Sequence, residues 1–352
     1  MPANERLGYR PQLDGVRALA VSAVVLYHLY LPVGAGGWIG VDIFFVLSGF
    51  LITSLLIEEW GATGKISLRQ FYARRALRLL PALAVLLAAV AVLSAVIHKE
   101  VSTEAIVTVA LYIGNWPAAL HGLDMGPLGQ CWSLGVEEQF YIVFPILFAL
   151  LLRRVSDWRK IATFIAAGII GSWALCLVLS NDNYMRLYFG TDTRAASLLM
   201  GCLGAIAFKS GWLDKISGRA LRVGALAAVA GLIGFTLAPL NISQYHWLAL
   251  YFGVIDLGAL VLVLGVLGQP AGAVGRVLAR RPLVAIGRLS YGIYLWSFPI
   301  DHIVQARIHN RIPLTVVELV LTATMAIASY RIVERPFLRL KKRFNVPVPT
   351  AT

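Results

Sequence analysis

The stretch that decides the fold is residues 13–31, LDGVRALAVSAVVLYHLYL. It is apolar over the length of a membrane helix, but it carries two ionisable residues, Arg17 and His28, eleven positions apart. Because an α-helix has about 3.6 residues per turn, both side chains lie on one stripe of this helix. An arginine near the centre of a membrane helix costs about 2.5–3.5 kcal/mol, so such residues usually face protein or water and mark a function. Alternatively, Arg17 reaches the interface and His28 is a hydrogen-bonded packing residue.

The composition is that of a membrane protein. The 352 residues are 59% hydrophobic and 14% charged, with a mean hydropathy of +0.75. These values exclude an ordinary soluble domain and are typical of a polytopic helical protein. The three cysteines have no CxxC spacing, so the sequence predicts neither a disulfide framework nor a metal site. No cleavable signal peptide is expected, because the first apolar run has no small-residue cleavage site after it.

Apolar runs and charge together predict an all-α fold with its topology. A shorter run, 103–116, leads into a polar loop and is expected to form a partial helix that does not cross. On that basis 26 of the 31 Lys and Arg residues fall on one side of the membrane. The positive-inside rule then places both termini in the cytoplasm, in a plasma (inner) membrane protein, and the net charge requires no nucleic-acid partner. The predicted spans are residues 14–32, 38–59, 77–98, 132–152, 161–180, 195–210, 221–238, 246–267, 283–304 and 314–333.

Carboxylates are expected near His28. His28 and Asp42 are equidistant from residue 35, in the loop between the first two spans, so we expect them at similar depth. A carboxylate on one imidazole nitrogen orients the ring and stabilises its protonated form, although Asp42 could instead cap a helix. Glu137 and Glu138 lie about 8–9 Å below the first residues of the fourth span, which is again the depth of His28. Adjacent helical residues point about 100° apart, so at most one of the two shares a site with His28. A bundle-locking hydrogen bond is the alternative for them.

A second candidate group is the arginine cluster in RQFYARRALRLLP, residues 69–81. Arg75 and Arg78 lie one turn apart, and Arg74 and Arg78 are related by four residues. Every basic residue here is arginine, whose fork matches phosphate. We therefore expect a phosphorylated ligand on the cytoplasmic side, with a topology signal alone as the alternative.

Weaker signals lie elsewhere. Asp192 and Arg194 are expected at the outer mouth of the sixth span, where they could hold a polar acceptor. Tyr291 and Trp296 could line a cavity or belong to the core. Ser48, beside Gly49, is expected mainly to allow close helix packing. The sequence contains no GxSxG elbow, P-loop or HExxH motif.

Five segments occur in one order along the chain: LDGVRALA (13–20), GWIGVDIFFVLSGFLIT (37–53), FYARRALRLLP (71–81), WSLGVEEQFY (132–141) and ERPF (334–337). Through them, over essentially its whole length, the sequence resembles the membrane-bound acyltransferase family 3. The resemblance implies a ten-helix bundle that uses acyl-CoA, typically acetyl-CoA, to O-acylate surface glycans or macrolides. It implies that His28 is the catalytic base and that Arg75 and Arg78 match an RxxR element linked to CoA. Ser297 departs from the family, in which a His commonly follows the Trp.

The leading hypothesis is therefore an O-acyltransferase with acyl-CoA as co-substrate, no permanently bound cofactor or metal, and a carbohydrate or glycosylated acceptor. A proton-coupled transporter of a polar or glycan-related solute is the alternative, because buried His, Asp and Glu could form a proton relay; a non-catalytic glycan-handling partner is a third. We expect one membrane domain over residues 1–344, a disordered tail at 345–352 and no appended hydrolase-like domain. The expected catalytic residues are His28, Asp42 and Glu137; the acyl-CoA-binding residues are Arg17, Arg74, Arg75 and Arg78; the substrate or cavity residues are Ser48, Trp132, Ser133, Glu138, Tyr141, Asp192, Arg194, Tyr291 and Trp296.

Overall fold

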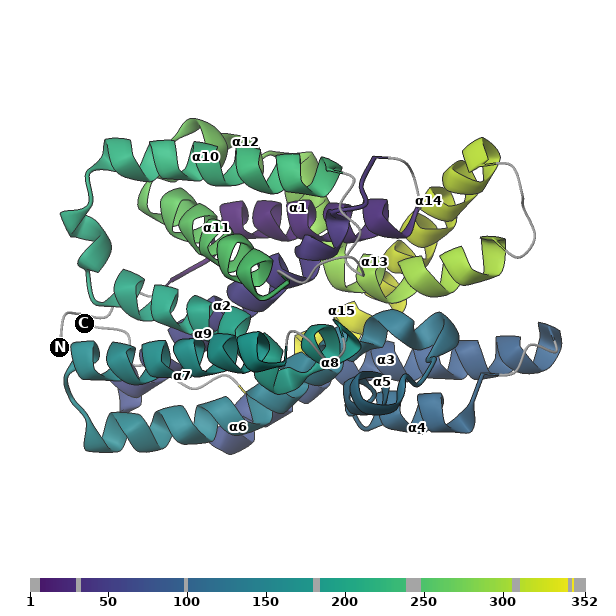
Figure 1. Cartoon of the computed structure of the whole chain (residues 1–352), viewed down its shortest axis with the longest axis horizontal. Coiled ribbons are helices and arrows are strands. Elements are labelled where there is room, and N and C mark those ends of the chain that lie inside the picture. The colour runs from purple at the N-terminus through teal and green to yellow at the C-terminus, as the bar shows by residue number, and fades with distance from the viewer. Residues whose placement is uncertain are drawn as a thin grey trace. The chain divides into compact units, whose positions relative to one another are not determined.

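The structure, a computed structural model, describes residues 7–29, 33–97, 101–179, 184–238, 248–305, 311–340 and 344. Every regular element in these ranges is helical (Figure 1). Each of the ten predicted spans corresponds to a long helix. These are α1 (Pro11–His28), α2 (Gly40–Thr63), α3 (Leu68–Ile97), α6 (Trp132–Arg154), α7 (Trp158–Val178), α9 (Thr191–Lys209), α10 (Gly218–Leu237), α11 (Leu248–Gly268), α13 (Arg281–Gln305) and α14 (Arg311–Ala328).

Short helical elements connect the long ones. The run predicted to form a partial helix contains α4, which has eight residues. Eight residues extend about 12 Å, far less than the hydrocarbon core of about 30 Å, so α4 is too short to cross. The other short elements are η1 (Gly37–Ile39), α5 (Asn115–His121), η2 (Gly126–Cys131), α8 (Tyr184–Phe189), η3 (Trp212–Lys215), α12 (Ala273–Leu278), the π-helical η5 (Ser329–Glu334) and α15 (Arg335–Leu340); α4 spans Thr103–Ala110.

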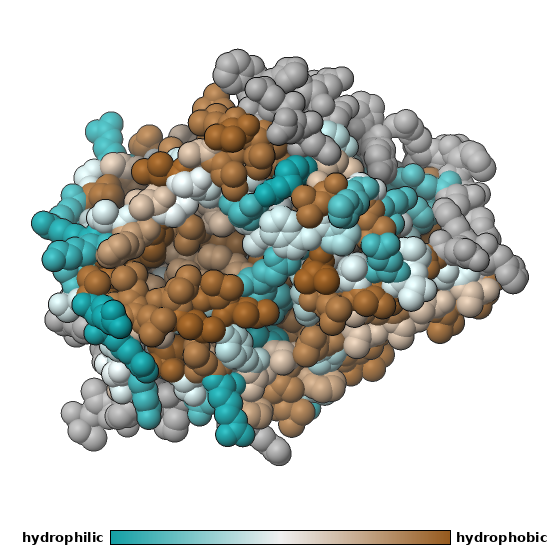
Figure 2. Space-filling view, turned by 60° about the horizontal axis from the view of Figure 1, so that its bottom comes forward, coloured by the Kyte–Doolittle hydropathy of each residue, from teal (hydrophilic) through white to brown (hydrophobic). Residues whose placement is uncertain are grey.

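The helices have the length and surface of a membrane bundle. Eight helical stretches in the described residues are long and apolar enough to cross a membrane. Of the ten long helices, α1 and α9 fall outside that group, and both carry charged residues along their length. Large apolar side chains such as Phe164 and Ile170 of α7 point outward, and apolar residues cover wide areas of the face in Figure 2. The prediction of an all-helical polytopic membrane protein is confirmed.

The chain forms two compact units. Unit 1 comprises residues 1–66 and 140–288, and unit 2 comprises residues 67–139 and 289–352. The boundaries fall just before α3, within α6 and in the first third of α13. A single domain over residues 1–344 stays a prediction. The expected disordered tail, 345–352, lies outside the described residues.

Helix α2 is the centre of unit 1, where it packs against α1, α9 and α11. Two glycines allow the closest of these contacts. A Cβ on Gly49 would overlap the Leu198 carbonyl, and a Cβ on Gly201 would overlap the Val46 carbonyl. Because each glycine removes a side chain where the partner backbone passes, α2 and α9 touch along their backbones. The expected packing notch beside Ser48 is therefore confirmed at Gly49.

In unit 2, a hydrogen-bond network ties the short helices to α6. The Gln139 amide donates to the Tyr112 carbonyl at 2.7 Å and to Asn115 Oδ1 at 2.8 Å. Gln139 Oε1 in turn accepts the Trp116 Nε1–H at 3.0 Å. The polar residues of this segment thus hold α5 against the beginning of α6.

Candidate functional site

His28 is the last residue of α1 and is half-buried. Its Nδ1 lies 2.8 Å from the carbonyl oxygen of Val24, one turn earlier. A carbonyl can only accept, so Nδ1 carries the proton of the neutral ring and the lone pair is on Nε2. The Tyr27 ring meets the imidazole edge-on, with centroids 5.2 Å apart. The helix backbone therefore selects the neutral tautomer whose basic lone pair is on Nε2.

The register of α1 against the start of α2 is set by three glycines. A Cβ on Gly34 would press on Leu26, one on Gly37 on Ala23, and one on Gly40 on the Ala20 carbonyl. Continuing this register along two antiparallel helices carries Asp42 toward the level of Ala18. At 1.5 Å per residue, that is about 15 Å from His28 along α1. The expectation that His28 and Asp42 lie at similar depth was wrong, because residues 34–37 fold back onto α1 and do not form a symmetric loop.

Asp42 pairs with Arg194 of α9. The Arg194 Nη2 donates to Asp42 Oδ1 at 2.5 Å, and both side chains are completely inaccessible to solvent. Asp42 Oδ2 has no hydrogen-bond partner in the part of the chain that is described. Asp42 therefore does not orient His28, and Arg194 does not lie at an outer mouth as expected. This pair connects helices separated by 152 positions in the sequence.

Aromatic rings surround the Arg194 guanidinium. Its Cζ lies 3.8 Å from the ring centroid of Phe252, 5.5 Å from that of Tyr188 and 5.6 Å from that of Phe45. These contacts stabilise a cation that has lost its water. They also explain why Nε and Nη1 of this guanidinium have no hydrogen-bond partner among the described residues.

Asp256 of α11 is a third buried charged group of unit 1 that the sequence analysis missed. It accepts a hydrogen bond from Ser197 at 3.0 Å and interacts electrostatically with both Asp42 and Arg194. Its signal was in the sequence, since it is the only acidic or basic residue in the 21-residue α11. An ionisable residue inside a membrane helix is by default a functional candidate.

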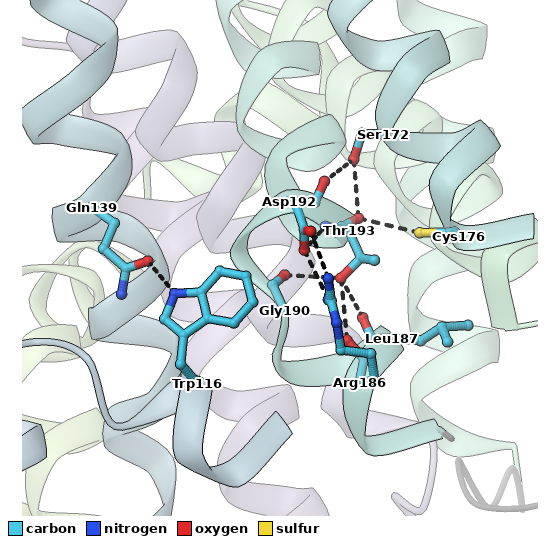
Figure 3. Close-up of polar contacts among 9 residues, drawn as sticks. All are labelled: Trp116, Gln139, Ser172, Cys176, Arg186, Leu187, Gly190, Asp192 and Thr193. Atoms are coloured by element: carbon cyan, nitrogen blue, oxygen red, sulfur yellow. Dashed lines mark hydrogen bonds and ion pairs between the residues drawn. The ribbon is translucent and has the colours of Figure 1, made fainter. Parts of the chain in front are cut away.

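Asp192 begins α9 and forms a separate ion pair (Figure 3). Its two oxygens accept from the Arg186 guanidinium at 2.8 and 2.6 Å. Partial burial alone would raise the pKa of Asp192, but the hydrogen bonds and charge of Arg186 lower it below its ordinary value. Ser172 of α7 donates to the Asp192 carbonyl at 2.6 Å, and Thr193 Oγ1 donates to the Leu187 carbonyl at 2.8 Å. Together these bonds fix α7, α8 and the first turn of α9 to one another.

The remaining candidates of unit 1 are Arg17, Ser48 and Tyr141. Arg17 and Ser48 are half-buried, and Tyr141 is buried. Near Arg17, α1 packs tightly against its neighbours: a Cβ on Gly15 would overlap Leu278, and one on Gly287 would overlap the Asp14 carbonyl. Arg17 thus stands on a helix segment whose position is sterically fixed.

Unit 2 holds the arginine cluster on α3. Arg74, Arg75 and Arg78 are all half-buried. Arg74 Nη1 donates to the Phe344 carbonyl at 2.8 Å, and the Arg75 guanidinium lies 5.9 Å from the Phe71 ring centroid. Arg75 also interacts electrostatically with Glu138. Two of the three arginines are thus held by contacts within unit 2, and a phosphate-binding role for the cluster stays a prediction.

Two candidate hydroxyl groups, one at the start of α6 and one in α13, form hydrogen bonds within unit 2. Ser133 lies 2.5 Å from the Tyr294 hydroxyl, which also donates to the Gln130 carbonyl at 2.8 Å. The Tyr291 hydroxyl donates to the Leu79 carbonyl at 2.9 Å. These bonds show that both hydroxyls take part in contacts between helices, and a substrate role for Ser133 and Tyr291 stays a prediction.

Glu138 and Trp296 have buried polar atoms without a hydrogen-bond partner in the described ranges, namely Oε1 and Nε1. Glu137 is half-buried, and Trp132 is buried. Ser297, which departs from the family pattern, is buried and bonds weakly to the Tyr294 carbonyl at 3.4 Å. Among the described residues, no group of three or more His, Cys, Asp and Glu side chains could hold a metal ion.

Comparisons with known proteins agree with the motifs. The sequence profile of the family described as "Acyltransferase domain", of the acyltransferase 3 type, matches residues 10–331. "O-acetyltransferase OatA" of Staphylococcus aureus (strain NCTC 8325 / PS 47) is 35% identical over 347 residues, which cover 93% of this chain and 57% of that protein. "Peptidoglycan O-acetyltransferase OatA" of Listeria monocytogenes is 34% identical over 348 residues, covering 93% of this chain and 56% of that protein.

This chain thus spans little more than half the length of these relatives. No solved structure matches it. The profile, however, covers nearly the whole of the chain, including α1 with His28, the arginine cluster of α3 and the start of α6. The chain belongs to the acyltransferase 3 family.

Proposed function

We propose that this chain is a membrane O-acetyltransferase that transfers an acetyl group from acetyl-CoA to a hydroxyl of a peptidoglycan glycan. The observation that carries the proposal is the bond between His28 Nδ1 and the Val24 carbonyl, which leaves Nε2 as the basic nitrogen. The transferred group is taken from the names of two relatives, both O-acetyltransferases, and the acceptor from the name of one of them, a peptidoglycan O-acetyltransferase.

In the reaction, His28 Nε2 takes the proton of the acceptor hydroxyl as its oxygen attacks the thioester carbonyl carbon. The C–S bond then breaks, and the CoA thiolate takes the proton from the His28 imidazolium and leaves as the thiol, which returns His28 to its neutral form. Correct placement of a base contributes typically 10²–10⁴-fold to such a step. The carboxylate that supports the imidazolium remains a prediction for Glu137, since the bonds of Asp42 are made to Arg194.

We assign the CoA phosphates to Arg74, Arg75 and Arg78, with Arg17 as a further donor-side residue. Arg74 and Arg75 each lie about one helical turn from Arg78, and each guanidinium can bind a phosphate through two N–H groups. The same arginines count toward the positive side of the membrane, so we extend the proposal to a donor side and two termini in the cytoplasm of a plasma membrane protein.

The test is release of CoA thiol from acetyl-CoA by the purified chain in the presence of peptidoglycan fragments. We expect His28→Gln to reduce the rate by at least about 100-fold, the lower part of the range for a general base. His121→Gln is the matched control, because His121 is exposed at the end of α5. Arg75→Ala should raise the KM for acetyl-CoA more than it lowers kcat, whereas Arg159→Ala, at an exposed arginine, should change neither. Full activity in His28→Gln would reject the proposed base, and thioester-independent movement of solute would favour the transporter.

A further inference from the structure

The last of the five sequence segments, ERPF at residues 334–337, has no part in the proposed reaction. It lies in unit 2, where α14 continues through the π-helical η5 into α15. Pro336, in the first turn of α15, has no backbone N–H, and in a continuous α-helix its ring would clash with the Ile332 carbonyl. A π-helical turn is wider by one residue and is frequent at functional sites. The wider turn therefore accommodates the proline and carries the helix on.

Charge divides this helical stretch into two parts. It runs from Pro313 to Leu340, and its residues 313–330 contain one charged side chain, Glu318. At about 1.5 Å per residue, this first part extends about 27 Å, close to the hydrocarbon thickness of about 30 Å. Residues 331–340 follow it and carry arginines at positions 331, 335 and 339. These last residues therefore lie at the level of the lipid headgroups, at one surface of the membrane.

The three arginines offer their charge to the outside. Arg331, Arg335 and Arg339 are exposed, and among the described residues none of their guanidinium groups has an ion pair or a hydrogen bond. The only acidic residue of this segment, Glu334, is 7% exposed, and its Oε1 accepts the Ser329 hydroxyl at 3.4 Å. The acid of the segment is thus turned inward, and the accessible charges are all positive.

Apolar side chains are exposed beside these arginines. Phe337 is 37% exposed and Leu340 is 40% exposed. At about 100° per residue, Arg335 and Arg339 share one side of α15, and the two apolar side chains point roughly 120–180° away from that side. α15 also packs against α3, which holds it in place (Figure 1). A topology signal requires only positive charge, whereas a helix that lies at the lipid interface has arginines on one side and apolar residues on the other.

We propose that η5 and α15 form a binding surface for an anionic phospholipid, with the phosphate on Arg335 and Arg339 and the acyl chains on Phe337 and Leu340. The fork of an arginine matches a phosphate. Each basic residue close to a negative membrane surface strengthens binding about fivefold, the equivalent of about 1 kcal/mol. The phosphates of CoA are the competing ligand, because α15 packs against the helix that carries the arginine cluster.

The test is native mass spectrometry of the full purified chain, titrated in detergent with phosphatidylglycerol or with phosphatidylcholine. The wild type should bind the anionic lipid more tightly. Arg335→Gln combined with Arg339→Gln should weaken binding of phosphatidylglycerol by about 25-fold and leave that of phosphatidylcholine unchanged. The matched control is Arg159→Gln combined with Lys160→Gln, which removes two exposed charges at the start of α7 and should change neither affinity.

A second variant tests the apolar half of the surface. Phe337→Ala keeps both arginines but removes the exposed ring, so it should weaken the binding of both lipids to the same extent. No effect of this variant would overturn the contact with the acyl chains.

The outcomes separate the lipid site from its alternatives. Loss of the preference for phosphatidylglycerol in the double arginine variant but not in the control supports the site. An equal loss in both proteins, or no preference in the wild type, overturns it. Displacement of bound phosphatidylglycerol by free CoA would assign these arginines to CoA and overturn it as well. If the double variant does not fold, Arg335→Gln and Arg339→Gln alone decide the question, each with an expected loss of about fivefold.

Discussion

Breaking the buried pair between Asp42 and Arg194 should destabilise the protein far more than breaking the pair between Asp192 and Arg186. Both are arginine–aspartate pairs of unit 1, with nitrogen–oxygen distances of 2.5 and 2.6 Å. They differ in burial: the side chains of the first pair are both 0% exposed, and those of Arg186 and Asp192 are 18% and 40% exposed. The comparison therefore tests whether desolvation outweighs geometry, since the exposed pair has two hydrogen bonds and the buried pair has one.

The expected magnitude follows from the surroundings of each pair. Removing one partner of a buried pair leaves an uncompensated charge and typically costs about 3–5 kcal/mol. For Asp42→Asn we expect the lower end of that range, because Asp256 still interacts with Arg194. For Asp192→Asn we expect about 1 kcal/mol or less, since water screens a half-exposed pair.

The assay is equilibrium unfolding in mixed micelles, with denaturing detergent titrated and helix content followed by circular dichroism. A cycle of Asp42→Asn, Arg194→Met and the double variant gives the coupling energy. The double variant should cost clearly less than the sum of the two single variants, because it removes both charges together. The same cycle with Asp192→Asn and Arg186→Met is the control. A coupling energy for the buried pair no larger than that of the exposed pair would refute the reasoning.

Three further outcomes are expected. Gly49→Ala should destabilise the folded protein by about 1–3 kcal/mol, because the new Cβ would overlap the Leu198 carbonyl. Its control is Gly231→Ala, where a Cβ meets nothing within 4 Å, and it should be neutral or stabilising in the same unfolding assay. The pKa of Asp192 is lowered in the folded protein, so its ion pair stabilises the fold fully above the ordinary Asp pKa, and this stabilisation is lost as pH falls through the folded pKa. The difference in unfolding free energy between wild type and Asp192→Asn should therefore become smaller from pH 7 toward pH 3. A difference that stays constant would contradict the assignment. Tyr294→Phe should cost about 1–2 kcal/mol through its lost bonds to Gln130 and Ser133, and Tyr184→Phe, at an exposed tyrosine, should cost almost nothing.

The helices could be predicted from the sequence because the bilayer sets their length. In the hydrocarbon core, a run of about 20 apolar residues folds as a helix, because a helix hydrogen-bonds the backbone N–H and C=O groups within the segment. The short α4 was predicted because the charge pattern favoured a partial helix over an eleventh crossing, and its eight residues are too few to span. The close packing at Gly49 could also be predicted from the sequence, because a small residue in an apolar helix often marks a place where another helix packs closely.

The partners of the buried charges could not be predicted from spacing. The interpretation of Asp42 assumed a symmetric loop between α1 and α2, but register depends on where Gly34, Gly37 and Gly40 meet α1. Arg194 was placed at an outer mouth because it lies two residues from Asp192. Adjacent helical positions diverge by about 100° each, so those two residues point to different surroundings. Only contacts distant in sequence could show that Arg194 faces Asp42 and Asp256.

These contacts change what a variant of Asp42 means for catalysis. Asp42 joins α2 to α9 through Arg194, and the glycines at 37 and 40 join the start of α2 to α1, which ends at His28. Loss of Asp42 should therefore reduce activity by displacing α1, and the loss of activity should parallel the loss of stability. A lower temperature, or a lipid that stabilises the fold, should then restore part of the activity. Loss of His28 removes the basic nitrogen itself, so no change of conditions that stabilises the fold should restore activity. A stable, fully folded Asp42→Asn protein without activity would instead return Asp42 to the chemistry.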